Sequence, residues 1–191
     1  MKPLLIIGAS SFGRLIAVLA DDCARPVAGF VDDANAGPDV LGGTLDLGDT
    51  LLPSDYDLVL AIGYKHLQAR FALFERLRAK GFYFPPLIHP GARISPHVSV
   101  GEGTLIMSGA DVDSFTDIGN ACVLWPRTVV SHDNRIGPNT FISPAATLCG
   151  FVTVGPGSFI GANSTIVDGT TLAEGSFVKA ATRYPHKKQA T

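Results

Sequence analysis

The sequence is short of charge, and its charges are nearly balanced. Only 17% of its 191 residues are Asp, Glu, Lys or Arg, and the formal net charge is −2. Such a chain has no global basic field to attract nucleic acid or anionic lipid. Hydrophobic residues make up 46% of the chain, which excludes disorder as its dominant state, because disordered chains are poor in apolar residues and rich in charge.

Cysteines and long apolar runs are scarce as well. Cys23, Cys122 and Cys149 are odd in number and widely spaced, which argues against a disulfide set or a zinc site. The five histidines show no ligand spacing, so we expect no metal. No stretch approaches the roughly 18 consecutive apolar residues of a membrane span, and the run at residues 4–7 is too short for the core of a signal peptide. We therefore expect a cytoplasmic protein with no membrane span.

The first 86 residues alternate strand and helix patterns. Short apolar runs at residues 4–7, 27–31 and 57–62 predict buried strands. Residues 65–80 carry apolar side chains at helical spacing, and a second helix pattern follows the first strand. Such alternation is typical of a small parallel sheet with helices on its faces. We predict an α/β domain over residues 1–86.

From residue 88 onward, aliphatic residues recur with a period of six. All sixteen positions taken at this spacing from Ile88 to Val178 are Ile, Leu or Val, and a small residue usually follows four positions later. This period fits neither a helix nor an alternating strand. It fits a prism-shaped parallel β-helix, in which each hexapeptide is one flat face and three faces make a coil of eighteen residues. The aliphatic and the small residues, Cys122 among them, are predicted to point inward.

The predicted prism spans residues 87–183, a little over five coils, and a basic tail follows at residues 184–191. Glycine recurs every eighteen residues at one corner, and we expect that corner to need the backbone freedom of glycine. These glycines are Gly101, Gly119, Gly137 and Gly155.

The two halves together resemble one family. The motifs that carry the resemblance are Gly-Ala-Ser-x-x-Gly at residues 8–13, Asp-Asp at residues 32–33, Ala-Ile-Gly at residues 61–63 and Leu-Ile-His-Pro at residues 87–90. They are similar to those of the bacterial sugar acyltransferases of the hexapeptide-repeat superfamily, related to sialic acid O-acetyltransferases and UDP-4-amino-sugar N-acetyltransferases. The resemblance implies a left-handed β-helix, a homotrimer with active sites between subunits, acetyl-CoA as co-substrate, and a nucleotide-linked amino sugar as substrate in surface-glycan synthesis.

The segment Ser131-His132-Asp133 matches the one that bears the catalytic histidine of this family. An imidazole, with an ordinary pKa of about 6.5, is suited to remove a proton from an amine or a hydroxyl near neutral pH. The resemblance implies direct transfer, with His132 as general base and the backbone N–H of Gly150 stabilising the tetrahedral oxyanion. Taken alone, His132 could be a solvated histidine of the outer face, and Asp133 either orients it or is a solvent-facing turn residue.

The first half is interpreted as the module that binds the nucleotide sugar. The helix that begins after the first glycine turn can receive a phosphate on its N–H groups, and the Asp-Asp pair ends a strand on the same edge of the sheet. The alternatives are NAD binding, or glycines that serve only the turn and packing with a solvated Asp33. The candidate substrate-binding residues are Gly8, Ser10, Phe12, Gly13, Asp32, Asp33, Gly63, Tyr64 and Trp125. The resemblance implies Gly150, Ala162 and Lys179 for acetyl-CoA.

Three aromatic residues depart from the family pattern. Phe12 and Phe141 stand where histidine is common, and Trp125 stands where asparagine is common; the usual Gly-x-Pro-Ala near the C-terminus is missing. These changes indicate a less polar acceptor, an acyl group larger than acetyl, or stacking on a base or sugar face. Two other functions stay open, namely sugar O-acetylation and a non-catalytic trimeric relative.

Overall fold

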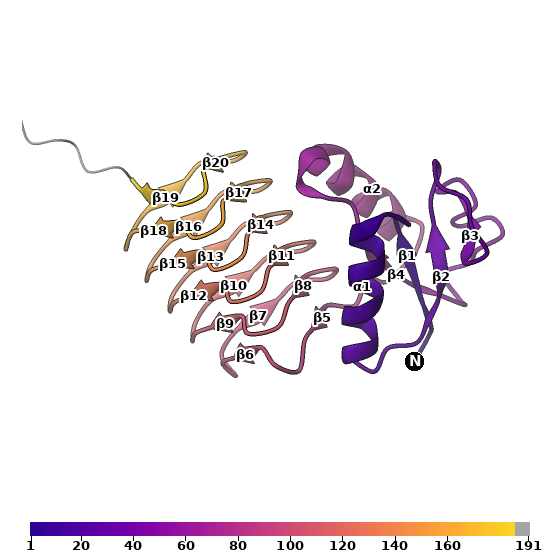
Figure 1. Cartoon of the computed structure of the whole chain (residues 1–191), viewed down its shortest axis with the longest axis horizontal. Coiled ribbons are helices and arrows are strands. Elements are labelled where there is room, and N and C mark those ends of the chain that lie inside the picture. The colour runs from indigo at the N-terminus through magenta and orange to yellow at the C-terminus, as the bar shows by residue number, and fades with distance from the viewer. Residues whose placement is uncertain (186–191) are drawn as a thin grey trace, which may run out of the picture. The chain divides into compact units, whose positions relative to one another are not determined.

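The computed structural model describes residues 1–185, and the chain divides into two compact units with the boundary between Leu87 and Ile88 (Figure 1). All helices of the described residues belong to the first unit. None of those helices has the length and apolar character that crossing a bilayer requires. The last six residues of the predicted basic tail, 186–191, lie outside the described residues.

The first unit is built on one parallel sheet with the strand order β3-β2-β1-β4. Its strands are β1 (Leu4–Ile7), β2 (Val27–Val31), β3 (Val40–Gly42) and β4 (Asp57–Leu60). Its helices are α1 (Ser11–Asp22), the 3₁₀ turn η1 (Tyr64–His66) and α2 (Leu67–Ala79). The small parallel α/β sheet predicted from the sequence is confirmed. Strand β3 was not predicted, because three residues are too few to show a period.

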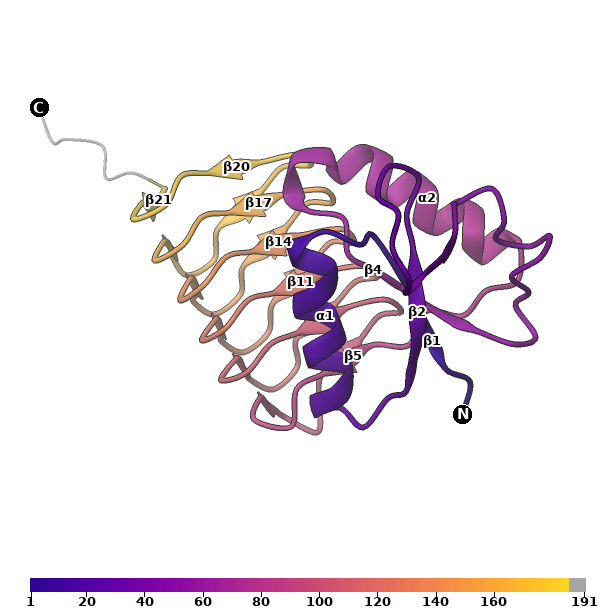
Figure 2. The same cartoon turned by 45° about the vertical axis from the view of Figure 1, so that its right-hand side comes forward.

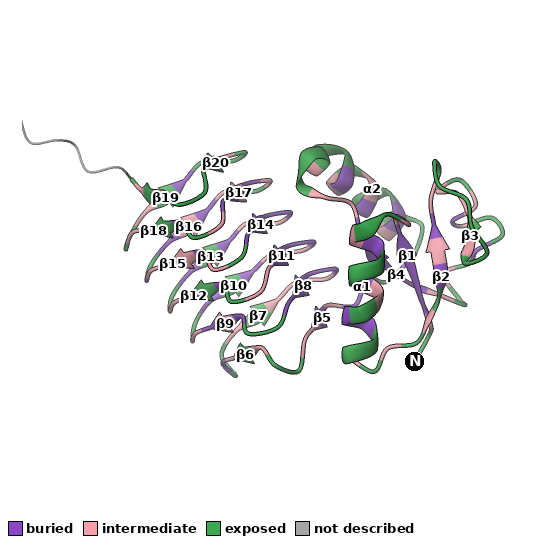
Figure 3. Ribbon diagram, viewed as in Figure 1, coloured by how far each residue is buried: buried purple, intermediate pink, exposed green. Residues whose placement is uncertain are grey.

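Burial explains these elements. All four residues of β1 are buried, as expected for a parallel strand that is covered on both faces (Figure 3). Helix α1 buries one side, at Ile16, Leu19 and Ala20. Helix α2 buries Phe74 and Leu77. Helix α2 therefore follows the apolar spacing seen in the sequence, whereas α1 leaves the apolar Leu15 and Val18 exposed.

Two glycines allow the turn from β1 into α1. Gly8 has a φ of +111°, in the region that favours glycine. A Cβ added at Gly13 would lie only 1.9 Å from the carbonyl oxygen of Gly8. Both positions thus require glycine for the local backbone to pack, with or without a ligand at this turn.

The second unit is a parallel β-helix with three flat faces, whose coils are stacked in Figure 2. The first face has the order β20-β17-β14-β11-β8-β5, the second β21-β18-β15-β12-β9-β6, and the third β19-β16-β13-β10-β7. The strands are β5 (Leu87–Ile88), β6 (Arg93–Ile94), β7 (Ser99–Val100), β8 (Leu105–Ile106), β9 (Asp111–Val112), β10 (Asp117–Ile118), β11 (Val123–Leu124), β12 (Val129–Val130), β13 (Arg135–Ile136), β14 (Phe141–Ile142), β15 (Thr147–Leu148), β16 (Thr153–Val154), β17 (Phe159–Ile160), β18 (Thr165–Ile166), β19 (Thr171–Leu172), β20 (Phe177–Val178) and β21 (Arg183–Tyr184).

The predicted inward residues form the core of this prism. Paired residues are eighteen apart, as Val123 and Phe141 are, so each coil has the predicted length. The aliphatic residues from Ile106 to Val178 are buried in one cluster, and the first three of the series lie partly buried against it. Cys122 is fully buried in the same cluster, which confirms it as a packing thiol. The predicted fold class is therefore confirmed.

The reason expected for the recurring glycines is wrong. They lack a left-handed φ, and the left-handed residues of this corner come two positions later, for example Ala121 and Asn139. A Cβ at Gly119 would instead lie 2.7 Å from the backbone nitrogen of Pro138 on the next coil. Close stacking of coils, and not backbone freedom, requires glycine here.

Candidate functional site

The candidate catalytic residues lie on the corner between the second and third faces. Each residue of this corner stacks on the one eighteen positions later, which gives the column Ser114, His132, Gly150 and Asp168. Backbone hydrogen bonds fix this stacking: the N–H of Asp133 donates to the carbonyl of Ser114 (3.1 Å), that of Phe151 to His132 (3.2 Å), and that of Gly169 to Gly150 (2.9 Å). The β-helix thus places Gly150 directly above His132, although the two residues are one whole coil apart in sequence.

His132 and Asp133 form a pair. The Nδ1 atom of His132 lies 2.8 Å from the Oδ2 atom of Asp133, and the two side chains are 46% and 41% exposed. An ionised carboxylate only accepts hydrogen bonds, so in the neutral imidazole beside it Nδ1 carries the hydrogen and the Nε2 atom keeps its lone pair. Phe151 packs against the imidazole with its ring plane at 88° and its centroid 5.2 Å away. The geometry thus favours an orienting role for Asp133 and leaves Nε2 able to accept a proton.

Gly150 lies directly beside this Nε2 atom. A Cβ built on Gly150 would stand 2.9 Å from Cε1 and 3.0 Å from Nε2 of His132, and 3.0 Å from Oδ1 of Asp168. Only glycine therefore lets the imidazole lie against this part of the backbone. Sequence reasoning missed Asp168, although the eighteen-residue period places it one coil beyond Gly150 and could have found it.

Within residues 1–185, the backbone N–H of Gly150 donates to no backbone carbonyl. Its position in the turn explains why. The equivalent position in several other turns of the β-helix is taken by proline, which has no N–H to donate; these residues are Pro90, Pro96, Pro126, Pro138, Pro144 and Pro156. The turn does not need the N–H of that residue for its backbone hydrogen bonds, although Glu102 and Ser114 at the same position donate theirs to side chains. The N–H of Gly150 can therefore serve a substrate oxygen near His132.

These residues suit acyl transfer. A proton acceptor at Nε2 of His132 and a hydrogen-bond donor at the N–H of Gly150 lie side by side, which is the pair that acyl transfer needs. Within the described residues, no group of three or more His, Cys, Asp or Glu side chains is placed to hold a metal ion.

A second candidate region lies in the first unit, at the carboxyl ends of β1, β2 and β4. A pocket of about 230 Å³ opens there, and it is lined by Ile7, Gly8, Val31, Asp32, Asp33, Ala34, Thr44, Ile62 and Leu73. This is the edge at which open parallel sheets bind ligands. The structure brings Gly8, Asp32 and Asp33 together here. Among the other predicted binding residues, Ser10, Phe12, Gly13, Gly63 and Tyr64 do not line this pocket.

Asp32 is held by four hydrogen bonds. The N–H of Ala9 donates to Oδ2 (2.7 Å), the N–H groups of Ala34 and Asn35 donate to Oδ1 (2.8 Å each), and the Asn35 side chain donates to Oδ2 (3.1 Å). The pKa of Asp32 is lowered, first by the Ala9 N–H and then by the other three donors, against an opposing effect of burial. Asp32 therefore ties the β1 turn to the loop after β2. Asp33 binds the N–H and hydroxyl of Thr44 (2.6 and 2.8 Å).

We predict that Asp32→Asn destabilises the first unit at neutral pH by about 1–3 kcal/mol, because an amide cannot accept all four hydrogen bonds. The stabilisation requires the ionised carboxylate of Asp32, and the pKa of this group lies below the ordinary value of about 3.9. It is fully present above that value and is lost as the pH falls below it. Urea unfolding at pH 7 and at pH 3 measures the free energy of unfolding of wild type and Asp32→Asn, with Asp49→Asn, at an exposed carboxylate, as control. Equal stability of wild type and variant at pH 7 contradicts the prediction.

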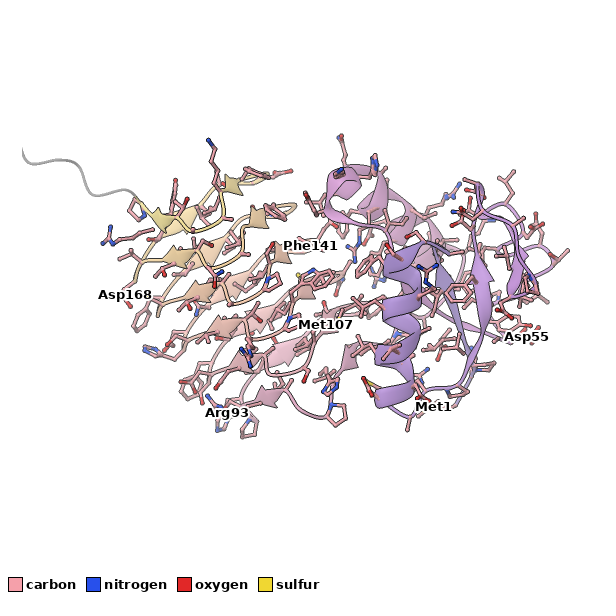
Figure 4. All side chains as sticks on the ribbon, in the orientation of Figure 1. Met1, Asp55, Arg93, Met107, Phe141 and Asp168 are labelled. Carbon is pink, nitrogen blue, oxygen red and sulfur yellow. The ribbon has the colours of Figure 1, made fainter. Side chains whose placement is uncertain are left out.

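The remaining predicted residues lie elsewhere on the prism. Trp125 and Phe141 belong to the first face, with ring centroids 5.9 Å apart. Ala162 and the exposed Lys179 lie at the corner between the first and second faces. Figure 4 shows Phe141 and Asp168 on different sides of the solenoid. Within one chain, Trp125 is therefore not brought together with His132, and Gly150 is not brought together with Lys179.

Comparison with known proteins bears on both units. Residues 3–77 match the family model of the PglD N-terminal domain, and residues 135–168 match that of the bacterial transferase hexapeptide (six repeats). No curated protein sequence matches the chain.

Several solved structures resemble the whole chain. The acetyltransferase domain of PglB from Neisseria gonorrhoeae FA1090 is 29% identical with a TM-score of 0.92, and the match covers 99% of this chain and 94% of that one. The same domain in complex with acetyl coenzyme A is 30% identical (TM-score 0.88; 94% and 88% covered). PerB from Caulobacter crescentus, in complex with CoA and GDP-perosamine, is 30% identical (TM-score 0.88; 96% and 89% covered).

A likeness of this extent defines a class, the hexapeptide-repeat transferases. Within that class the chain belongs to the sugar acetyltransferase family of PglB and PerB, which has a left-handed β-helix. The family predicted from the sequence is thus confirmed.

Proposed function

We propose that this protein transfers an acetyl group from acetyl-CoA to the amino group of a nucleotide-linked amino sugar. The observation that carries the proposal is the position of the Nε2 atom of His132, about 3.0 Å from where a Cβ of Gly150 would stand. The complexes of PglB with acetyl coenzyme A and of PerB with CoA and GDP-perosamine support it. We place the reaction in the cytoplasm, in the synthesis of a surface glycan.

His132 acts as the general base in this proposal. Acetyl-CoA supplies an activated acyl group when it is bound. Nε2 of His132 accepts the proton of the sugar amine as the new C–N bond forms, and returns it to the departing sulfur as the C–S bond breaks. Asp133 holds the Nδ1 hydrogen and stabilises the imidazolium that forms. The N–H of Gly150 donates to the acyl oxygen as negative charge develops there. Because His132 can perform both proton transfers, no covalent acyl-enzyme is required.

The first unit binds the nucleotide. The pocket at the carboxyl ends of β1, β2 and β4 combines an apolar lining, from Ile7, Val31, Ile62 and Leu73, with the carboxylate of Asp33. An apolar cleft with a few polar groups is suited to a nucleobase and its ribose. The N–H groups at the start of α1 suit the phosphates. Asp32 contributes by shaping the loop, since its two oxygens already accept four hydrogen bonds within residues 1–185, whereas those of Asp33 accept only two, both from Thr44, and can accept more.

The active protein is a homotrimer in this proposal. Trp125 and Lys179 lie on or beside the first face, away from the corner that carries His132, so one chain alone does not gather the predicted set. In a ring of three chains, the first face of one prism can complete the His132 corner of its neighbour. Light scattering is expected to give the mass of three chains at working concentration.

CoA release from acetyl-CoA tests the function. The purified protein is assayed with GDP-, UDP- and dTDP-linked 4-amino and 3-amino sugars, and with the matching 4-hydroxy and 3-hydroxy sugars. We expect turnover with an amino sugar and none with its hydroxy counterpart. Turnover with the hydroxy sugars alone shows an O-acetyltransferase instead. No turnover together with no CoA binding by calorimetry leaves a non-catalytic relative as the better explanation.

A further inference from the structure

An exposed carboxylate stands next to the reaction centre. Asp168 lies one coil beyond Gly150, on the same corner of the β-helix as His132, and it is exposed to solvent. The N–H of the following residue, Gly169, donates to the carbonyl of Gly150 at 2.9 Å. This bond fixes the turn that carries Asp168 on the turn that carries Gly150. No step of the proposed transfer uses the Asp168 carboxylate.

The carboxylate of Asp168 has its full capacity to accept hydrogen bonds. Within residues 1–185 it accepts no hydrogen bond and forms no ion pair. Its neighbours at this corner are engaged: Oδ1 of Asp113 accepts the N–H of Ser114 at 2.8 Å, and Oδ2 of Asp133 holds Nδ1 of His132 at 2.8 Å. An ionised carboxylate can accept several donors on its two oxygens. Asp168 therefore offers a negative charge and open acceptor sites to a ligand.

The spacing of Asp168 and His132 suits one nitrogen atom between them. Oδ1 of Asp168 and Nε2 of His132 are both 3.0 Å from the point at which a Cβ of Gly150 would stand, so they lie within about 6 Å of each other. Hydrogen bonds donated by nitrogen span about 2.7–3.2 Å. Because Gly150 has no Cβ, it leaves this space to a ligand. A nitrogen placed there can donate to both acceptors at once.

A protonated primary amine fits this pair of acceptors. It carries three hydrogens, of which one can point to Nε2 of His132 and another to Oδ1 of Asp168. When Nε2 takes the first proton, the electron pair that stays on the nitrogen forms the bond to the acyl carbon. The second hydrogen keeps the nitrogen bound to Asp168 meanwhile. Asp168 exchanges no proton in this step.

A hydroxyl group fits the same pair poorly. It has a single hydrogen and can donate to only one of the two acceptors. A hydroxyl that donates to His132 turns its own lone pairs toward the carboxylate of Asp168. It also carries no charge, whereas hydrogen bonds donated by an ammonium group to a carboxylate are roughly twice as strong as neutral ones. The pair therefore favours an amine over a hydroxyl at the same carbon of a sugar.

We propose that Asp168 binds the ammonium group of the acceptor sugar and thereby selects an amine over a hydroxyl. This inference rests on the proposed function, since it names the side chain that decides between N- and O-acetylation at one and the same base. His132 performs the proton transfer, and Asp168 determines which acceptor is held beside it.

Steady-state kinetics test the assignment by separating KM from kcat. Wild type and Asp168→Asn are assayed with the nucleotide-linked amino sugar that wild type acetylates. The control is Glu174→Gln, an exposed carboxylate at the same position of the next turn, six residues later. We expect Asp168→Asn to raise KM for the amino sugar about tenfold, because a neutral amide replaces the charged partner. Its kcat and its KM for acetyl-CoA should stay close to those of wild type, as should all constants of Glu174→Gln.

Calorimetry gives a second measurement that needs no turnover. The amino sugar and the matching hydroxy sugar, both linked to the same nucleotide, are titrated into wild type and Asp168→Asn in the presence of CoA. We expect wild type to bind the amino sugar about tenfold more tightly than the hydroxy sugar. Asp168→Asn should bind the two about equally, and it should bind the hydroxy sugar no more weakly than wild type does.

Other outcomes overturn the assignment. An unchanged KM for the amino sugar excludes the contact, and a rise confined to the KM for acetyl-CoA places Asp168 against the co-substrate instead. A loss of kcat alone shows that Asp168 acts on His132, and an equal loss for amino and hydroxy sugars shows a general disturbance of the turn. With an active wild type, these results refute this inference alone. A wild type that acetylates none of the amino sugars refutes the proposed function, and this inference with it.

Discussion

Replacing His132 by alanine is expected to lower turnover about 10²–10⁴-fold, the range that a general base contributes. The reason is geometric. Nδ1 is engaged by Asp133 at 2.8 Å, and Nε2 lies beside the backbone of Gly150, 3.0 Å from where its Cβ would stand. No other side chain in this column, which holds Ser114 and Asp168, is a base of comparable strength near neutral pH. The variant should lose kcat and keep its affinity for CoA.

A matched control separates this role from a structural one. His97 is an exposed histidine on the same corner of the β-helix, where its ring stacks on Phe115 at 5.3 Å. His97→Ala should keep wild-type turnover, because His97 lies three coils away from Gly150. The melting temperature of both variants should stay close to that of wild type, since His132 is about half exposed. If His132→Ala retains more than a tenth of the wild-type kcat, His132 is not the base.

The aspartate refines the same test. Asp133→Asn keeps the size of the side chain but can donate a hydrogen bond to Nδ1, which favours the tautomer with hydrogen on Nε2. We expect a loss of kcat of the same order as that of His132→Ala, with unchanged CoA binding. The double variant should be no worse than the worse single one, because the two residues act as a unit. Full activity of Asp133→Asn leaves Asp133 as a turn residue only.

The period of six explains why so much of the second unit could be predicted. One inward aliphatic every six residues fixes the coil length, the three faces and the core, and therefore also which residues stack. The same rule places Gly150 above His132 and Asp168 above Gly150. In contrast, β3 (Val40–Gly42) carries no such signal, and the strand predicted at residues 57–62 ends at Leu60. A short strand in a mixed sequence depends on its neighbours in the sheet, which a local pattern does not contain.

Other features were beyond the reach of the sequence for different reasons. The period gives no account of hydrogen bonds inside a loop, so the engagement of Asp32 by Ala9, Ala34 and Asn35 was not foreseen. The period does show that Trp125 and His132 lie at different positions around the coil. It does not show which surfaces of two chains meet. The recurring glycines were explained wrongly because two properties of glycine, a permissive φ and the lack of a Cβ, give the same sequence pattern.

Gly150→Ala is expected to lower turnover about 10²-fold, although it adds one methyl group and removes no functional group. The new Cβ would stand 2.9 Å from Cε1 and 3.0 Å from Nε2 of His132, closer than carbon and nitrogen atoms approach without bonding. The imidazole must then move, and a displacement of about 1 Å at a reacting group can cost this much. Alanine keeps the backbone N–H, so the loss reports the position of the base and not a missing hydrogen-bond donor.

Comparing the loss of turnover in Gly150→Ala with its loss of stability makes this test specific. The imidazole is half exposed and can rotate outward, so Gly150→Ala should cost about 1 kcal/mol or less in unfolding free energy, toward the low end of what overpacking costs. Gly37→Ala is a suitable control, because its Cβ would meet only Val40, at 4.0 Å. The double variant Gly150→Ala/Asp168→Ala also removes the other side chain near the new Cβ, that of Asp168. Its turnover should stay low, because contact with His132 is what lowers the activity of Gly150→Ala. Recovery in that double variant would mean that the methyl group acts by pushing Asp168 into the site, and not by moving the imidazole.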